Sequence, residues 1–566
     1  MSARRQPTND EWQLGPEPHE LQEFERPGDG ESKVDFSASR LTRPVQVVTV
    51  EHLLWIGIAA WAGLSRFLEL GMGPLTPDEA RHALFEFDLV NGTDWASATG
   101  YHPASGGWIH LFEAGLFAAG GTSDSTARLI FALGGLSMIA VAFLMRASIG
   151  RAGAIALAGL ITISPTFTYF SRTSAIDIVT AAIALAVVEG FIRLAKRPNL
   201  LAAIGLGSLS GLLCAAGPAG LASGSILLLA LGLLGLYQLI VSGRMSLNLR
   251  IWLLRYTWVA VATIIATGLS WSISEMSLFR LSDIWKTLLT VRDGFSGRDY
   301  LSSVQYYGPG ILLYEVLIVL TTIAGLLAIL SLRAWSRLAL FSSLWLVMSL
   351  LYFLGSYERE SARLVLMLLP AVMVSAIGID YLHHTRAWGY VRPVFATLVI
   401  ATVYVQVEAN LIYAAPHIHE APWNRHANLY WRDGATTAQA RADLDAIRRR
   451  FPEEGGTAFS LGVWPPSLRW YLRDFRPASS SKLADLVINS NPPATEIRDS
   501  GSQNTSVVHL EQSWEPTLSS LAPRSAIRFA LTATASTPII EKTIAITERP
   551  SSDLAPTLVI PPPILH

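Results

Sequence analysis

Long apolar runs separated by short polar turns fill the middle of this 566-residue chain. An α-helix of about 20 apolar residues is long enough to cross the roughly 30 Å of hydrocarbon in a bilayer. We therefore predict a mainly α, polytopic membrane protein with about 11 transmembrane helices. The predicted spans are 46–70, 128–145, 152–164, 176–194, 200–216, 219–241, 256–273, 310–331, 338–355, 362–382 and 393–413.

The two ends of the chain have a different pattern. Residues 1–43 contain no apolar run and many Pro, Gly and acidic residues, which predicts a disordered cytoplasmic tail without a signal peptide. Residues 415–566 have the composition of a soluble protein. There, 436–451 has the apolar spacing of an amphipathic helix. Short strand-like runs follow at 457–463, 484–490, 505–510, 526–533 and 543–547. We expect a tail (1–43), a transmembrane domain (44–414) and a small extracytoplasmic α/β domain (415–566).

The composition excludes several other classes of protein. Charged residues make up only 15 % of the chain and hydrophobic residues 51 %, which excludes a disordered protein. Lys and Arg number 43 against 44 for Asp and Glu, without a basic face, so we expect no nucleic-acid partner. Cys214 is the single cysteine, which excludes intramolecular disulfides, a Cys-ligated zinc site and an iron–sulfur cluster.

The charges of the connections between spans predict the orientation. Alternate turns are basic and free of acidic residues, as in 146–151, 193–197, 244–255, 333–337 and 386–392. The positive-inside rule places such turns in the cytoplasm, together with the N-terminal tail. The opposite connections, 71–127, 165–175, 274–309 and 356–361, are mixed or acidic. An odd number of spans then places the C-terminal domain outside, in a multi-pass protein of the plasma membrane.

The first outer loop, 71–127, begins with a helix signal. Pro77 is followed by Asp78 and Glu79, an early proline and two acids beside the positive end of the helix dipole. Arg81 and His82 lie one turn beyond Asp78, and we predict an amphipathic helix at the membrane surface. The two acids have a purely structural alternative, in which they only cap the helix.

Further polar residues in the outer loops invite a functional interpretation. Tyr101 and His102 precede a glycine pair and a second apolar helix at 108–119. Arg172 and Asp177 lie close to a span boundary, where charge is disfavoured. Arg172 could snorkel to lipid headgroups or hold a phosphate oriented by Asp177, and the sequence leaves both alternatives open.

Six stretches, taken in order, resemble those of a known superfamily. They are PDEARHALFEFDLVNG (77–92), YHPASGGWIHLFEAGLF (101–117), SPTFTYFSRTSAIDI (164–178), YYGPGILLYE (306–315), SYERESARLVLMLLP (356–370) and WPPSLRWYLRDF (464–475). The ordered set is similar to that of GT-C glycosyltransferases, such as protein mannosyltransferases and aminoarabinose transferases. Within them it is most similar to the prokaryotic flippase-activity-associated membrane proteins. The resemblance implies a GT-C-like transmembrane domain.

The resemblance also implies a reaction and its site. A polyprenyl-phosphate-linked sugar would be transferred, with inversion, to a glycan, lipid or protein acceptor at the outer membrane face. Asp78 would be the catalytic base, and Glu79 its helper or a metal ligand. Substrate contacts would come from Arg81, Tyr101, His102, Arg172, Asp177 and Glu358. No cofactor is certain. Some members use a divalent metal, although the sequence contains no dedicated zinc or calcium motif.

Several departures from the family pattern keep alternatives open. After Tyr101-His102 the chain reads Pro-Ala-Ser-Gly in place of Gly-Pro-Leu, and the Pro-Trp expected after Glu358-Arg359 is absent. The chain could therefore be a non-catalytic accessory that binds or translocates lipid-linked glycans. A secondary transporter fits less well, because no inverted repeat is evident.

Two segments have a functional and a structural interpretation. Loop 274–309 has the length of a flap over the membrane face, or forms an ordinary interfacial helix. The aromatic residues Trp464, Trp470 and Tyr471 could stack on carbohydrate, or pack the C-terminal domain on the membrane module.

Overall fold

The computed structural model describes most of the central part of the chain and shorter segments of the C-terminal part. The described residues are 49–71, 74–92, 107–197, 199–242, 257–267, 269, 300–331, 336–356, 360–385, 388–407, 435–436, 438–449, 457–460, 466–473, 475–477, 486–489, 505–514 and 539–548. The chain divides into two compact units, 1–57 and 58–566. In the first unit only residues 49–57 are described, and they include the beginning of helix α1.

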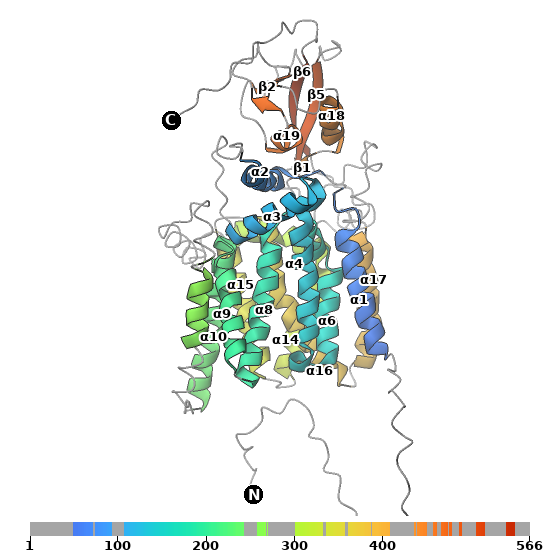
Figure 1. Cartoon of the computed structure of the whole chain (residues 1–566). Helices are drawn as coiled ribbons and strands as arrows, with labels where there is room; N and C mark the ends of the chain where they lie inside the picture. Colours follow the sequence, from blue (N-terminus) through green and yellow to red (C-terminus); the bar gives the residue numbers. More distant parts are fainter. Residues whose placement is uncertain are drawn as a thin grey trace, which may run out of the picture. The chain divides into compact units, whose positions relative to one another are not determined.

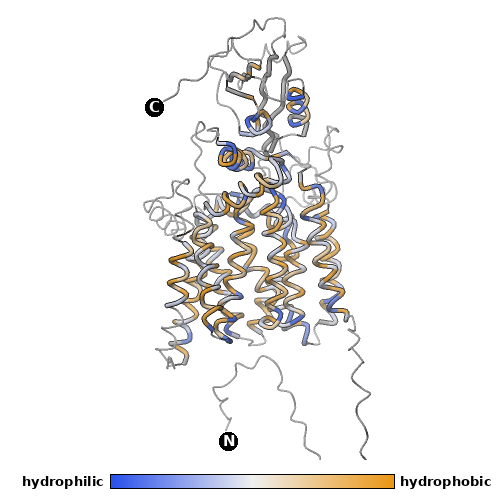
Figure 2. The backbone as a smooth tube through the Cα atoms, in the orientation of Figure 1, coloured by the Kyte–Doolittle hydropathy of each residue, from blue (hydrophilic) through white to orange (hydrophobic). Residues whose placement is uncertain are grey.

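Helices dominate the part of the chain before residue 408. They are α1 (Val50–Phe67), α2 (Pro77–Asn91), α3 (Gly107–Gly120), α4 (Asp124–Leu144), α5 (Arg146–Ile149), α6 (Arg151–Ile163), α7 (Pro165–Ser171), α8 (Ile176–Lys196), α9 (Leu200–Cys214), α10 (Pro218–Ser242), α13 (Tyr300–Tyr314), α14 (Val316–Ser331), α15 (Arg337–Gly355), the 3-10 helix η4 (Ser361–Arg363), α16 (Leu364–His383) and α17 (Trp388–Gln406). Figure 2 shows that hydrophobic residues cover the upright helices along most of their length.

Six of the described helices are long and apolar enough to cross a membrane, so the chain is a multi-pass membrane protein. They contain the segments Asp124–Leu144, Ile176–Lys196, Pro218–Gln238, Arg337–Gly355, Ser361–His383 and Gly389–Gln406. A seventh span is possible if α6 and α7, which meet at a bend of 63°, form one broken span. Leu200–Cys214, Thr257–Thr267 and Val316–Ser331 are shorter apolar helices. Helices thus occupy the predicted spans, and the total of eleven crossings stays a prediction.

The bend between α6 and α7 has a local cause. Residues 165–171, which the sequence analysis assigned to a loop, form the helix α7. Ser164 ends α6 in an extended conformation, its hydroxyl caps α7 at Phe167, and Pro165 occupies the first turn. Proline favours a helix start and cannot continue the preceding helix, so the chain restarts in a new direction.

Helix α16 is buried from Leu364 to Ile379 and packs closely on α14. At the crossing point two glycines face each other: a Cβ added to Gly378 would lie 2.2 Å from the Cα of Gly325. Small residues allow helix backbones to approach in this way inside a membrane protein.

Helices α2 and α3 lie across one end of the upright helices, between these and the C-terminal segments (Figure 1). Thr76 caps α2 in a capping box with Glu79, Pro77 stands in the first turn, and Gly92 ends the helix with a φ of 65°. This confirms the predicted helix start at Pro77. It also shows that Glu79 has the capping role considered as the structural alternative.

The C-terminal segments form a six-stranded sheet in the order β1-β5-β6-β4-β2-β3. The strands are β1 (Ala435–Thr436), β2 (Thr457–Ser460), β3 (Arg476–Pro477), β4 (Leu486–Asn489), β5 (Thr505–Trp514) and β6 (Ile539–Glu548), and the helices are α18 (Ala438–Arg448) and α19 (Pro466–Tyr471). Strand β2 runs parallel to β3 and β4, whereas β5 and β6 pair antiparallel. The predicted strand at 526–533 lies outside the described residues.

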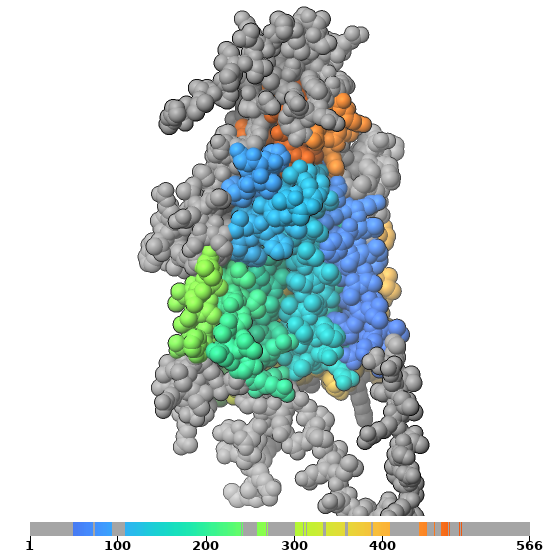
Figure 3. Space-filling model, in the orientation of Figure 1, coloured from blue at the N-terminus to red at the C-terminus, as the bar shows by residue number. Residues whose placement is uncertain are grey.

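A single hydrophobic cluster joins the sheet-bearing segments to the helices beneath them. It includes Ala80 and Leu84 of α2 together with Leu444 of α18 and Trp470 of α19. In Figure 3 the orange C-terminal residues lie against the blue residues of α2. Helix α2 therefore packs against α19 of the C-terminal segments as well as against α3.

Candidate functional site

Glu79 anchors the beginning of α2. Its carboxylate accepts two hydrogen bonds from Arg128 of α4, from Nε to Oε1 at 2.8 Å and from Nη2 to Oε2 at 2.9 Å. Both side chains are buried. The backbone amides of Thr76 (2.8 Å) and Ser174 (2.9 Å) donate to the same carboxylate. Four donors thus surround Glu79, and these contacts favour a structural role over that of a catalytic helper or metal ligand.

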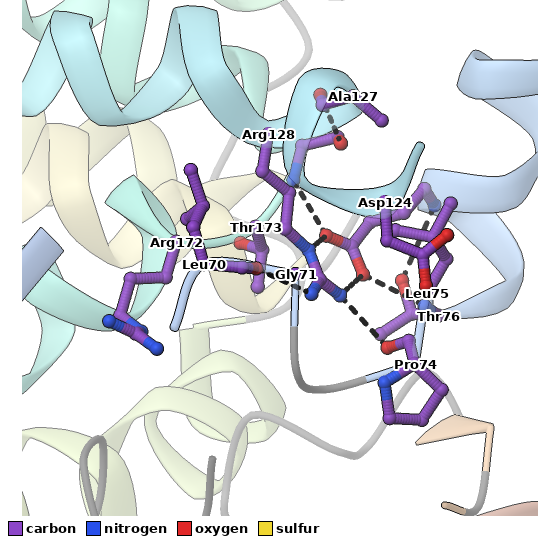
Figure 4. Close-up of polar contacts among 12 residues, drawn as sticks. Leu70, Gly71, Pro74, Leu75, Thr76, Asp124, Ala127, Arg128, Arg172 and Thr173 are labelled. Atoms are coloured by element: carbon purple, nitrogen blue, oxygen red, sulfur yellow. Dashed lines mark hydrogen bonds and ion pairs between the residues drawn. The ribbon is translucent and has the colours of Figure 1, made fainter. Parts of the chain in front are cut away.

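Arg128 also fixes the connection between α1 and α2. Its guanidinium donates to the carbonyl oxygens of Leu70 (3.2 Å) and Pro74 (2.8 Å), and Figure 4 shows these bonds around the labelled turn. Burial alone would raise the pKa of the Glu79 carboxyl, but the Arg128 charge and the hydrogen bonds outweigh it and the pKa is lowered. Glu79 is therefore held as a carboxylate.

Asp78, which directly precedes Glu79, has a different environment. Its side chain is 58 % exposed and pairs with Arg81 on the same helix. Partial desolvation raises the pKa of the Asp78 carboxyl, Arg81 lowers it, and the neighbouring Glu79 raises it, so the net direction is upward. An accessible carboxylate with a raised pKa, on a helix whose first turn is anchored by the Glu79–Arg128 ion pair, is suited to accept a proton.

Arg172 lies just beyond the end of α7 and binds backbone. Its Nη1 donates to the carbonyl oxygens of Ser65 (2.9 Å) and Leu68 (2.8 Å), and Nη2 to that of Glu69 at 3.4 Å. Figure 4 shows its guanidinium pointing away from Arg128. The short loop after Arg172 also carries Ser174, whose amide reaches Glu79, so this loop and the start of α2 lie together.

Asp177 belongs to a second polar group. It is buried at the beginning of α8 and interacts electrostatically with Glu360 and Arg363. Among the residues that the structure describes, no hydrogen bond joins Asp177 to Arg172, so the expected orientation of this arginine finds no direct contact. The hydroxyl of Tyr306 lies 3.1 Å from that of Ser361, which connects α13 to the same group.

Three predicted site residues, Tyr101, His102 and Glu358, lie outside the described residues. The structure thus gathers Asp78, Glu79 and Arg81 on α2 with the Arg172 loop nearby, and places Asp177 with the 360–363 turn. The catalytic and substrate-binding roles of these residues remain predictions.

The aromatic residues of α19 pack against the membrane helices. Trp470 Nε1 donates to Asp124 Oδ1 at 2.7 Å, and the Tyr471 hydroxyl donates to Asp124 Oδ2 at 3.0 Å. The Leu75 amide donates to the same hydroxyl at 2.8 Å. Trp470 is fully buried, so it packs the C-terminal segments on the helices and is not exposed for stacking on carbohydrate. Trp464 lies outside the described residues.

A third group of side chains lies between α2 and α3. His82, Glu86 and His110 place their potential ligand atoms within 4.8 Å of one another. Sequence reasoning noted His82 but gave no role to Glu86 or His110. The signal was present as a histidine and a glutamate one turn apart on each of two consecutive helices, His82–Glu86 and His110–Glu113. It also missed Arg128, which stands at the first position of a predicted span, where an arginine is costly and therefore informative.

Comparison of the structure with solved structures identifies the fold. ArnT from Cupriavidus metallidurans bound to undecaprenyl phosphate is similar with a TM-score of 0.56 and 15 % identity, over 89 % of this chain and 99 % of ArnT. The same protein in its apo state gives a TM-score of 0.51 and 17 % identity, over 81 % and 96 % of the two chains. The chain has the GT-C fold. The fold is the one that the resemblance implies, while membership of the superfamily and the narrower resemblance to flippase-activity-associated proteins stay predictions.

A more distant similarity is to the oligosaccharyltransferase of Archaeoglobus fulgidus tethered with an acceptor peptide. The TM-score is 0.47 at 14 % identity, over 77 % of this chain and 64 % of that one. No protein-family model matches the sequence. No curated protein matches it either.

Proposed function

We propose that this protein is a membrane glycosyltransferase that transfers a sugar from a polyprenyl-phosphate donor to an acceptor hydroxyl at the outer membrane face. The observation that carries the proposal is Asp78, an accessible carboxylate of raised pKa at the start of a helix that Glu79 and Arg128 fix in place. The GT-C fold supports it, since ArnT of the same fold binds undecaprenyl phosphate.

In the proposed reaction, an acceptor oxygen attacks the anomeric carbon of the donor sugar. The new bond forms from that oxygen to the carbon, and the bond from the carbon to the phosphate oxygen breaks on the opposite face, which inverts the configuration. Asp78 takes the proton of the acceptor hydroxyl, and polyprenyl phosphate leaves with the bonding electrons. Bonds, proton and leaving group are all accounted for in this step without a cofactor.

The leaving phosphate requires positive groups, and α2 supplies them. Arg81 is 42 % exposed and lies one turn from Asp78, and the amides at the beginning of α2 add the positive end of the helix dipole. Arg172 is a second candidate, because among the described residues its Nη2 makes one hydrogen bond, a long one of 3.4 Å to Glu69 O. His102, Tyr101, Asp177 and Glu358 stay in the proposal as further substrate contacts.

The proposal includes a topology. Eleven crossings with the N-terminal tail (1–43) in the cytoplasm place the loop that carries α2 outside, together with residues 415–566 as an extracytoplasmic α/β domain. The sheet and helix α19, which pack on α2, agree with this placement.

The experiment uses the purified full-length chain, labelled polyprenyl-phosphate sugars of several kinds, and glycan, lipid and protein acceptors from cell extracts. Wild type is compared with Asp78→Asn and with Asp445→Asn. Asp445 is a matched control, a 42 % exposed aspartate paired with an arginine on its own helix, at 3.8 Å from Arg441. Transfer by wild type and Asp445→Asn but not by Asp78→Asn supports the proposal. Tight donor binding without transfer from any donor overturns it in favour of the accessory alternative.

A further inference from the structure

Helices α2 and α3 bring four titratable side chains together, of which His82 is half-buried and the other three are buried. His82 and Glu86 lie one turn apart on α2, and His110 and Glu113 lie one turn apart on α3. The two histidines stack with their ring centroids 5.7 Å apart. Nδ1 of His110 contacts Oε1 of Glu86. Residues one turn apart share a helix face, so each helix presents one imidazole and one carboxyl group to the other.

The two carboxyl groups are deeply buried and incompletely satisfied. Glu86 is fully buried and Glu113 is 1 % exposed. Among the described residues, Oε2 of each has no hydrogen-bond partner. Two acids placed together without solvent are costly unless they share a proton or bind a cation.

The two imidazoles supply ring nitrogens beside the Glu86 carboxyl group, which together make a possible ligand set for a metal ion. Neutral imidazole nitrogens with a carboxylate oxygen form the ligand set that zinc uses in many proteins. Here the three ligand atoms lie within 4.8 Å of one another, close enough to surround one ion after small adjustments of the side chains.

We propose that His82, Glu86 and His110 bind one divalent transition-metal ion, of which zinc fits the ligand set best, with Glu113 as the neighbouring carboxylate that orients Glu86. The ion connects α2 to α3. Asp78 lies one turn before His82 on the same face of α2, so the metal fixes the helix that presents the proposed base without contacting it. The site shares no ligand residue with the Glu79–Arg128 anchor.

A direct test measures zinc in the purified full-length chain after incubation with zinc chloride and passage over a chelating resin. Elemental analysis gives the stoichiometry, and competition with a coloured chelator gives the affinity. We expect one zinc ion per chain and a higher melting temperature with zinc than without it. These readouts measure binding, so they are independent of whether the chain transfers sugar.

Variants assign the ligands. His110→Gln and Glu86→Gln should abolish stoichiometric binding, His110→Cys should retain it, and Glu113→Gln should weaken it by roughly 10–100-fold, as expected for a group that orients a ligand. His384→Gln is the matched control, because this histidine is at the end of α16 and bonds a backbone carbonyl. It should bind zinc as wild type does.

Two results would overturn the metal site. One is a monodisperse wild type that binds neither zinc nor cobalt, which would mean that the carboxyl groups share a proton. The other is unchanged affinity in folded His110→Gln and Glu86→Gln variants. Absorption spectra of the cobalt-loaded wild type and His110→Cys give a second readout, since a thiolate ligand adds a charge-transfer band only if position 110 binds the ion.

Discussion

Glu79 and Arg128 form a buried, doubly hydrogen-bonded ion pair that joins the first turn of α2 to the second turn of α4. Because Asp78 precedes Glu79 directly, the ion pair fixes the backbone from which the proposed base extends. The same carboxylate accepts the Ser174 amide, so the loop that carries Arg172 is tied to the same point. One glutamate thus positions two of the predicted site elements.

Replacing Glu79 by Gln should destabilise the protein strongly. Removal of one partner leaves the Arg128 charge buried without compensation, at a cost of about 3–5 kcal/mol. The matched control is Glu360→Gln, since Glu360 pairs with Arg363 at 3.4 Å but is 61 % exposed, and such pairs contribute about 1 kcal/mol or less. Thermal unfolding in detergent measures both. Equal melting temperatures for the two variants would refute the anchoring role.

The same ion pair predicts how stability depends on pH. The pKa of Glu79 is lower in the folded protein than in the unfolded chain, so the folded state favours the carboxylate. Its contribution is complete above the unfolded glutamate pKa of about 4.3 and is lost as the pH falls through the lower, folded value. Wild type should therefore lose melting temperature more steeply than Glu79→Gln below about pH 4.3. Parallel curves would contradict this linkage.

The sequence predicts the helices well and the anchor poorly, for a physical reason. Apolar runs and the Pro-Asp-Glu start are local signals, and they locate α2, α4 and α8 within a few residues, whereas α7 and most of α13 fall where loops are predicted. The partner of Glu79 is 49 positions away in the chain, and only the fold determines that Arg128 meets it. The sequence therefore offers both a chemical and a capping interpretation of Glu79, and only the fold shows its contact with Arg128.

Asp124 should be needed for the docking of α19. It accepts hydrogen bonds from Trp470 and Tyr471, and Asp124→Ala would leave these buried donors unsatisfied, at about 1–3 kcal/mol each. We expect faster hydrogen exchange in 466–473 and little change in α16. The control Asp445→Asn should leave exchange in 466–473 as in wild type. Unchanged protection in Asp124→Ala would show that apolar packing alone holds α19.

Gln406 should stabilise the contact of α17 with helices α6 and α7. Its side chain accepts from Trp61 Nε1 at 2.9 Å and donates to Thr162 O at 2.5 Å and Thr168 Oγ1 at 2.6 Å. Gln406→Leu should lower the stability by about 1–3 kcal/mol, because these groups lose their partner in a dry interior. Thr397→Val is the control on the same helix, because among the described residues the Thr397 hydroxyl donates to one group, the carbonyl oxygen of Pro393. Equal stability of both variants in detergent would exclude this role for Gln406.

The candidate site was only partly predictable for a similar reason. Asp78 and Arg81 lie three positions apart on one helix, so periodicity alone places them together. Arg172 and Asp177 are also near in sequence, but the turn between α7 and α8 sends Arg172 to the end of α1 and Asp177 to the 360–363 turn. Side chains at a helix break diverge in ways that spacing cannot predict.

The most direct test of the central claim is the pH dependence of the single-turnover transfer rate for wild type and Asp78→Asn. A base acts only when deprotonated, so the wild-type rate should fall as the pH decreases through the Asp78 pKa, which is raised above the ordinary value of about 3.9. Asp78→Asn should be about 10²–10⁴-fold slower and should lack this acidic limb. A variant that transfers sugar at the wild-type rate with the same acidic limb would contradict the assignment of Asp78 as the base.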